Sequence, residues 1–69
     1  MKTLKINGKE IEFTDGLPQT LIDLLKYLNI NETTIVVELD GKIVVKEDFA
    51  KTSLTCGQNI ELIRFVGGG

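Results

Sequence analysis

The chain has 69 residues and a formal net charge of −2, so we expect one small domain. Apolar residues make up 42% of it and charged residues 26%, a balance that is typical of a globular protein and argues against disorder. It lacks the basic cluster of a nucleic-acid-binding protein and the apolar run of a membrane span or signal peptide. A single cysteine, Cys56, excludes an intramolecular disulfide. We expect a cytoplasmic protein without nucleic-acid or membrane partners.

The first stretch, TLKINGKEIEF (residues 3–13), predicts a β-hairpin. Apolar and polar residues alternate on both sides of Asn7-Gly8. This dipeptide favours a tight hairpin turn because both of its residues tolerate a positive φ.

The second stretch, TLIDLLKYLNI (residues 20–30), predicts a helix. Its leucines at positions 21, 24, 25 and 28 follow the i, i+3, i+4, i+7 spacing of one helical face. Thr20 is the expected N-cap, with Asp23 in a capping-box position, and Asn29 is the expected C-terminal stop.

The rest of the chain predicts three more strands and one helical turn. TIVVELDGKIVV (residues 34–45) reads as a second hairpin around Asp40-Gly41. KEDFA (residues 46–50) is expected to form a single helical turn that carries Phe49 inward. NIELIRFV (residues 59–66) reads as the last strand, and a turn precedes it.

This order of elements, β-β-α-β-β-β, predicts an α+β fold in which one main helix covers one face of a mixed sheet of about five strands. The arrangement is consistent with the ubiquitin-like β-grasp architecture. We expect the domain to span residues 1–66 and to be followed by a flexible glycine tail at residues 67–69.

Catalysis within this chain is not expected. The sequence has no histidine, so no Ser-His or Cys-His pair exists. No spacing of Cys, Asp or Glu suggests a metal site, and we read the acidic residues as a solvated surface. Cys56 is interpreted as a packing or turn residue, since no basic neighbour in the sequence would activate its thiol.

One face of the last strand is a candidate binding surface. If Ile60 and Leu62 point under the helix, Ile63 and Phe65 point to the open side of the sheet, where Val36 joins them. An exposed apolar patch of this kind often marks a binding site. The alternative is that a loop covers these residues or that the face assignment is shifted by one.

The sequence ends in FVGGG, Phe65 to Gly69. Glycines add little to a core, but they fit a narrow channel that would exclude any side chain. The tail ends in a carboxylate, which becomes a good electrophile only after activation, for example by adenylation. A sulfur nucleophile would then produce a thiocarboxylate, and an amine or alcohol would give a conjugate.

The whole chain resembles the ThiS family, the sulfur carrier proteins of thiamin biosynthesis. IELIRFVGGG carries the resemblance most specifically, and INGKEIE and TLIDLLKYL agree with it. The resemblance implies that Gly69 is adenylated and converted to a thiocarboxylate. It also implies that Gly67 and Gly68 thread the tail into partners, and that Phe65 and Ile63, with Val66 beside them, form a docking strand. Cys56 has no role in the family pattern.

The resemblance also implies partners. These are a ThiF-like adenylyltransferase that uses Mg-ATP, a sulfur donor such as a cysteine desulfurase, and a ThiG-like thiazole synthase. The chain itself would bind no cofactor or metal and would serve as a sulfur donor, not as an enzyme.

Other functions remain open at this point. The small subunit of molybdopterin synthase and carriers for tRNA thiolation share the fold and the thiocarboxylate chemistry, although the third glycine argues against the former. A ubiquitin-like protein modifier would form isopeptide conjugates. A non-catalytic β-grasp interaction module would work without its tail.

Overall fold

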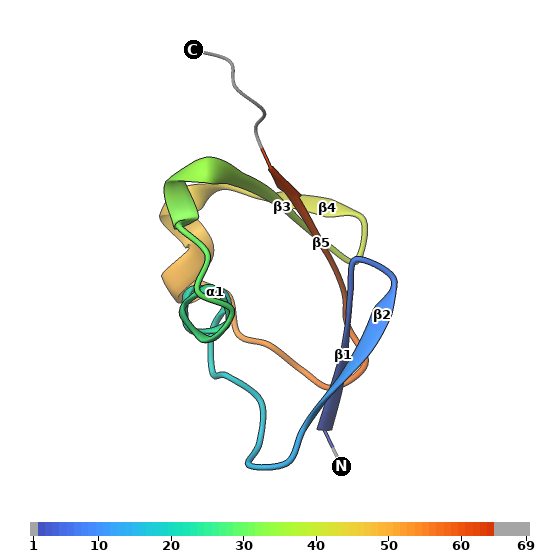
Figure 1. Cartoon of the computed structure of the whole chain (residues 1–69). Coiled ribbons are helices and arrows are strands. Elements are labelled where there is room, and N and C mark those ends of the chain that lie inside the picture. The colour runs from blue at the N-terminus through green and yellow to red at the C-terminus, as the bar shows by residue number, and fades with distance from the viewer. Residues whose placement is uncertain (1, 65–69) are drawn as a thin grey trace.

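The computed structural model describes residues 2–64 and contains the predicted elements in the predicted order (Figure 1). The strands and helices are β1 (Lys2–Ile6), β2 (Lys9–Phe13), α1 (Leu21–Tyr27), β3 (Ile35–Leu39), β4 (Lys42–Val44) and β5 (Asn59–Arg64). Two short 3-10 helices, η1 (Glu32–Thr34) and η2 (Lys46–Lys51), precede β3 and follow β4. The sequence analysis missed η1, which takes up Thr34 at the start of the predicted second hairpin.

Both hairpin turns are confirmed, and in each the backbone needs the residue types present. Asn7 and Gly8 have φ values of 51° and 83°, and Asp40 and Gly41 have values of 50° and 87°. Paired positive φ values produce the turn whose twist matches that of two antiparallel strands.

The helix cap is also confirmed. The Thr20 hydroxyl accepts a hydrogen bond from the Asp23 N–H at 3.3 Å and donates one to the Asp23 carboxylate at 3.0 Å. The helix ends at Tyr27, and Asn29 then adopts a φ of 60°, which stops the helical backbone.

The five strands form one mixed sheet in the order β2-β1-β5-β3-β4. The central strands β1 and β5 are parallel, and every other pair is antiparallel. Figure 1 shows α1 on one side of this sheet. The predicted α+β fold, with a mixed sheet and one main helix on one face, is therefore confirmed.

The core lies between α1 and the sheet. Leu21, Leu24 and Leu25 of the helix are buried, and Phe49 points inward from η2 as predicted. Leu4, Ile6, Phe13, Ile35, Val37, Leu54 and Ile60 complete this buried cluster. Since each strand buries alternate residues toward the helix, the intervening side chains face away from it.

Candidate docking face

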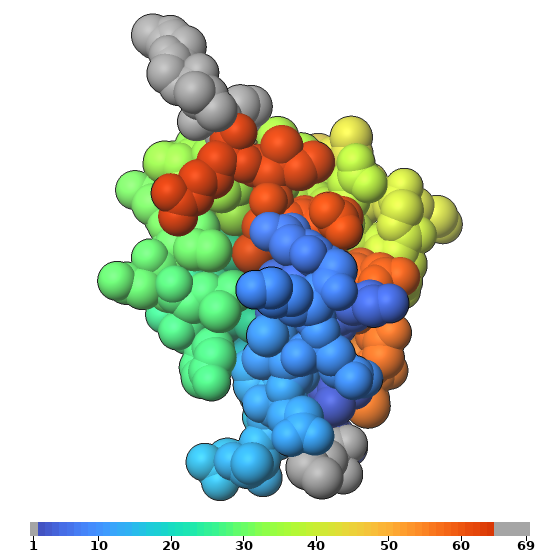
Figure 2. All heavy atoms as spheres, turned by 45° about the vertical axis from the view of Figure 1, so that its right-hand side comes forward, coloured from blue at the N-terminus to red at the C-terminus, as the bar shows by residue number. Residues whose placement is uncertain are grey.

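The side of the sheet that faces away from α1 is called the open face. Strand alternation places ten described residues on it: Thr3, Lys5, Glu10, Glu12, Val36, Glu38, Ile43, Asn59, Glu61 and Ile63. Figure 2 shows β5 (red) at the surface between the first hairpin (blue) and the second hairpin (green to yellow).

Two residues of the predicted docking surface lie directly opposite one another on this face. Val36 of β3 pairs with Ile63 of β5. Ile63 is 46% exposed and Val36 is half-buried. The exposure of Ile63 shows that no described loop covers this side chain. The structure therefore brings Val36 and Ile63 together on the open face, while their role in binding stays a prediction.

The other predicted site residues lie outside the described part of the chain. These are Phe65, Val66, Gly67, Gly68 and Gly69. The proposed boundary between a domain of residues 1–66 and a tail of residues 67–69 lies there too and stays a prediction.

Ile43 is an apolar residue of the open face that the sequence analysis did not single out. It is 66% exposed and pairs with Glu38 across β3 and β4. Counting the alternation outward from the Asp40-Gly41 turn would have placed it on the same face as Val36. We call Val36, Ile43 and Ile63 the apolar patch.

The open face is more acidic than the chain as a whole. Four glutamates and one lysine give its strand residues a formal charge of −3, whereas the complete chain has −2. The apolar patch and two of these glutamates, Glu38 and Glu61, occupy β3, β4 and β5. The face thus combines apolar contact area with a negative potential.

Side chains from both hairpin turns hold β5 in place. The Asn7 amide oxygen accepts the Leu62 N–H at 2.7 Å, and the Asn7 amide nitrogen donates to the Leu62 carbonyl at 3.4 Å. The Asp40 carboxylate accepts the Asn59 N–H at 2.8 Å. Asn7 therefore replaces a strand neighbour where β5 runs past the end of β1.

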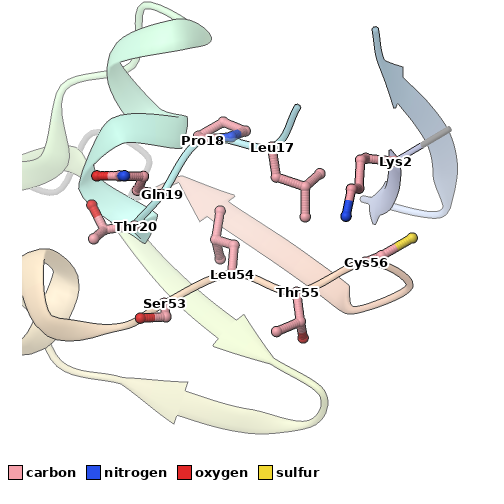
Figure 3. Close-up of a pocket in the computed structure, with 9 residues that line it drawn as sticks. All are labelled: Lys2, Leu17, Pro18, Gln19, Thr20, Ser53, Leu54, Thr55 and Cys56. Atoms are coloured by element: carbon pink, nitrogen blue, oxygen red, sulfur yellow. The ribbon is translucent and has the colours of Figure 1, made fainter. Parts of the chain in front are cut away.

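A shallow groove lies on another side of the molecule (Figure 3). It has a volume of about 600 Å³ and is lined by Lys2, by the segment before α1 and by the segment before β5. Figure 3 shows Lys2 and Cys56 at one end and Thr20 and Ser53 at the other, with Leu17 and Leu54 between them. The lining carries no carboxylate, so it offers no acid–base pair.

Cys56 is exposed, and its surroundings differ from the sequence-based expectation. Its Sγ atom accepts a hydrogen bond from the Thr3 N–H at 3.5 Å and lies 3.9 Å from the Thr3 hydroxyl. These contacts, followed by the positive charge of Lys2, lower the pKa of the Cys56 thiol. The expectation that no basic residue lies near Cys56 was wrong, because β1 brings Lys2 to the turn from the far end of the sequence.

The described residues offer neither a metal site nor a membrane-spanning helix. Residues 2–64 contain no group of three or more Cys, Asp or Glu side chains placed to hold a metal ion. Within the same range, no helix has the length and apolar character needed to cross a membrane.

Comparison with known proteins gives consistent matches over nearly the whole chain. The ThiS family model matches residues 4–69. The sulfur carrier protein ThiS of Bacillus subtilis is 32% identical over 66 residues, which cover 96% of this chain and 98% of that protein. A thiazole synthase of Paramagnetospirillum magneticum is 33% identical over 66 residues, which cover 96% of this chain and 20% of that protein.

The solved structures agree with the sequence matches. The crystal structure of the thiamine biosynthesis protein ThiS from Geobacter metallireducens superposes with a TM-score of 0.84 at 29% identity. The match covers 97% of this chain and 99% of that one. The same β-grasp arrangement and the family match through Gly69 lead to one conclusion: the chain belongs to the ThiS family of sulfur carrier proteins.

Proposed function

We propose that this protein carries sulfur for thiazole synthesis as a thiocarboxylate on Gly69. The observation that supports this most directly is the match to the ThiS family over residues 4–69, which includes the glycine sequence. The Bacillus sulfur carrier aligns over 98% of its own length, so the relationship is not limited to a shared sheet.

The first step of the proposed reaction activates the carboxylate. A ThiF-like adenylyltransferase binds Mg-ATP, and an oxygen of the Gly69 carboxylate attacks the α-phosphorus. Pyrophosphate leaves, and the resulting acyl adenylate has AMP as a good leaving group. Gly67 and Gly68 allow the tail to enter the narrow site, because neither has a side chain.

The second step replaces oxygen by sulfur. A persulfide, for example on a cysteine desulfurase, attacks the Gly69 carbonyl carbon and AMP leaves. A second thiol then cleaves the sulfur–sulfur bond, is itself oxidised to a disulfide, and releases the thiocarboxylate. This carrier contributes its tail and its docking face as a cosubstrate, and its partners provide catalysis and the Mg-ATP site.

The sulfur acceptor is proposed to be a ThiG-like thiazole synthase. Support comes from the Paramagnetospirillum relative, which is a thiazole synthase and matches this chain over one fifth of its length. When the counterparts of two proteins are joined in one polypeptide, the separate proteins often bind one another. The match therefore supports binding between this carrier and a thiazole synthase.

The open face provides a place for such partners to bind. The apolar patch lies on β3, β4 and β5, and β5 leads directly toward the glycine residues. A partner seated on Val36 and Ile63 would therefore hold the domain close to the point where the tail begins. Phe65 and Val66 are proposed to extend this contact.

Intact-protein mass spectrometry tests the function. Incubation with a ThiF-like adenylyltransferase, Mg-ATP, a cysteine desulfurase, cysteine and a thiol reductant should replace one oxygen by sulfur. Fragmentation should place the change on the peptide that contains Gly69. The unreacted mass also verifies that Gly69 is the last residue.

A chain with one alanine appended after Gly69 is the matched control and should not accept sulfur. After removal of ATP and the sulfur source, a ThiG-like synthase supplied with the thiazole precursor that accepts the sulfur should return the carrier to its native mass. Failure of the wild-type chain to change mass with an enzyme that loads another ThiS protein would contradict the proposal. Sulfur transfer to a pterin precursor in place of thiazole would contradict the assigned pathway.

A further inference from the structure

Glu38 and Glu61 lie directly opposite one another on the open face. They are register partners in the antiparallel pair formed by β3 and β5. Directly opposite residues on one face have Cβ atoms about 5 Å apart. We call these two residues the glutamate pair. Like charges in this arrangement destabilise a sheet, so the pair is unfavourable for the isolated domain.

The strand neighbours do not neutralise the glutamate pair. On the other side of Glu38, the register partner is Ile43. Lys5, the cation among the described strand residues of this face, stands directly opposite Glu10 on β2. Glu10 therefore stands opposite a positive charge. Each member of the glutamate pair stands opposite another negative charge.

The apolar patch adjoins the glutamate pair. Ile43 lies in the same cross-strand row as the two glutamates, and Val36 and Ile63 form the next row. A partner that covers this patch would exclude water from the carboxylates beside it. Charged hydrogen bonds are stronger where water is excluded, so a cation brought by the partner would be favoured at this position.

We propose that the glutamate pair receives an arginine side chain of the adenylating enzyme, which docks with apolar residues over Val36, Ile43 and Ile63. This inference rests on the proposed function, because it assigns the contact to the ATP-using partner. Arginine suits the site because its planar guanidinium group can bind two carboxylates at once. An enzyme that binds ATP also needs positive charge near the triphosphate. That positive charge would attract the acidic open face of this carrier.

The charge of the face disfavours other occupants. A second copy of the chain would bring a second face of charge −3 against the first, with two further glutamates facing the pair. An anionic membrane surface would be repelled for the same reason. A basic and apolar protein surface complements both properties of the face.

Binding measurements with neutral, isosteric variants test the inference. The Kd of the full chain for a purified ThiF-like adenylyltransferase is measured by calorimetry for wild type, Glu38→Gln, Glu61→Gln and the double variant. Each single change should weaken binding about tenfold, as expected for loss of a charged hydrogen bond. The double variant should lose less than the product of the two effects, because one arginine serves both carboxylates.

Glu10→Gln is the matched control, since it removes one negative charge from the same face and should change the Kd less than twofold. Thermal unfolding of the free variants should show Tm values equal to or above that of wild type, because removing one glutamate relieves a like-charge contact.

Three results would overturn the inference: unchanged affinity in Glu38→Gln and Glu61→Gln, an equal loss in Glu10→Gln, or a loss seen only with the thiazole synthase. The sulfur loading of wild type is measured in parallel. Normal loading with unchanged variant affinities rejects the glutamate site alone, whereas absent loading rejects the proposed function.

Discussion

Turn residues in this protein act through both backbone and side chain. Asn7 and Asp40 adopt the positive φ that each hairpin requires, and their side chains also hydrogen-bond to β5. Glycine would satisfy only the first requirement. The choice of Asn and Asp at these positions therefore links the two hairpins to the strand that leads toward the glycine tail.

Cys56 is a second residue whose properties depend on distant sequence. Because its pKa is lowered in the folded chain, a larger fraction of the thiol is ionised at a given pH than after unfolding. The thiolate is the form that reacts with iodoacetamide. We therefore expect the pH midpoint of alkylation to lie lower for the native protein than for the same protein in urea.

Variants can separate the causes of this shift. Thr3→Val removes the hydroxyl but keeps the backbone N–H of residue 3, which contributes most to the lowered pKa. The midpoint should therefore rise only part of the way toward that of the denatured protein. Lys2→Gln should raise it less. Lys5→Gln, which changes a lysine of the opposite sheet face, is the control and should leave it unchanged. Equal midpoints for native and denatured protein would contradict the assignment.

At the scale of elements, β5 joins the two halves of the sheet. It is parallel to β1 over Asn59 and Ile60 and antiparallel to β3 along Ile60 to Arg64. Beyond Ile60 the β1 side of the strand is held by the Asn7 side chain. This single amide therefore contributes to both sheet continuity and the position of the docking face.

Replacing Asn7 tests that contribution. Asn7→Ala should lower the free energy of unfolding by about 2 kcal/mol, about half from the lost hydrogen bonds and half from alanine at positive φ. Asn7→Asp keeps the acceptor for the Leu62 N–H and should lose less than half as much. Urea denaturation measures both, and equal losses in the two variants would argue against the contact with β5.

The sequence predicted the elements well because their signals are local. Asn7-Gly8, Asp40-Gly41 and the Thr20 cap each act within four residues, and the structure confirms all three. The register between β3 and β5 has no local signal, so the cross-strand pairing of Glu38 with Glu61 did not follow from the sequence. The lysine beside Cys56 was missed for the same reason, since sheet pairing alone brings the two together.

At the scale of the whole molecule, the two sides of the sheet have separate roles. One side packs on α1 and holds the core, whose described members lie between Leu4 and Ile60. The other side carries the apolar patch and four glutamates. Changes to the open face and to the tail should therefore affect partner binding and sulfur loading more than folding.

Deleting residues 67–69 tests this separation directly. Because the described core lies within residues 4–60, the truncated chain should unfold within about 3 °C of wild type, yet it should accept no sulfur. Deleting everything after Ile60 is the contrasting variant, since it removes the residues that pair with Ile35 to Glu38 and should abolish cooperative unfolding. Thermal unfolding followed by circular dichroism measures both. A large loss of Tm from the three-residue deletion would mean that the glycines contribute to the fold, and the proposed division between domain and tail would then be wrong.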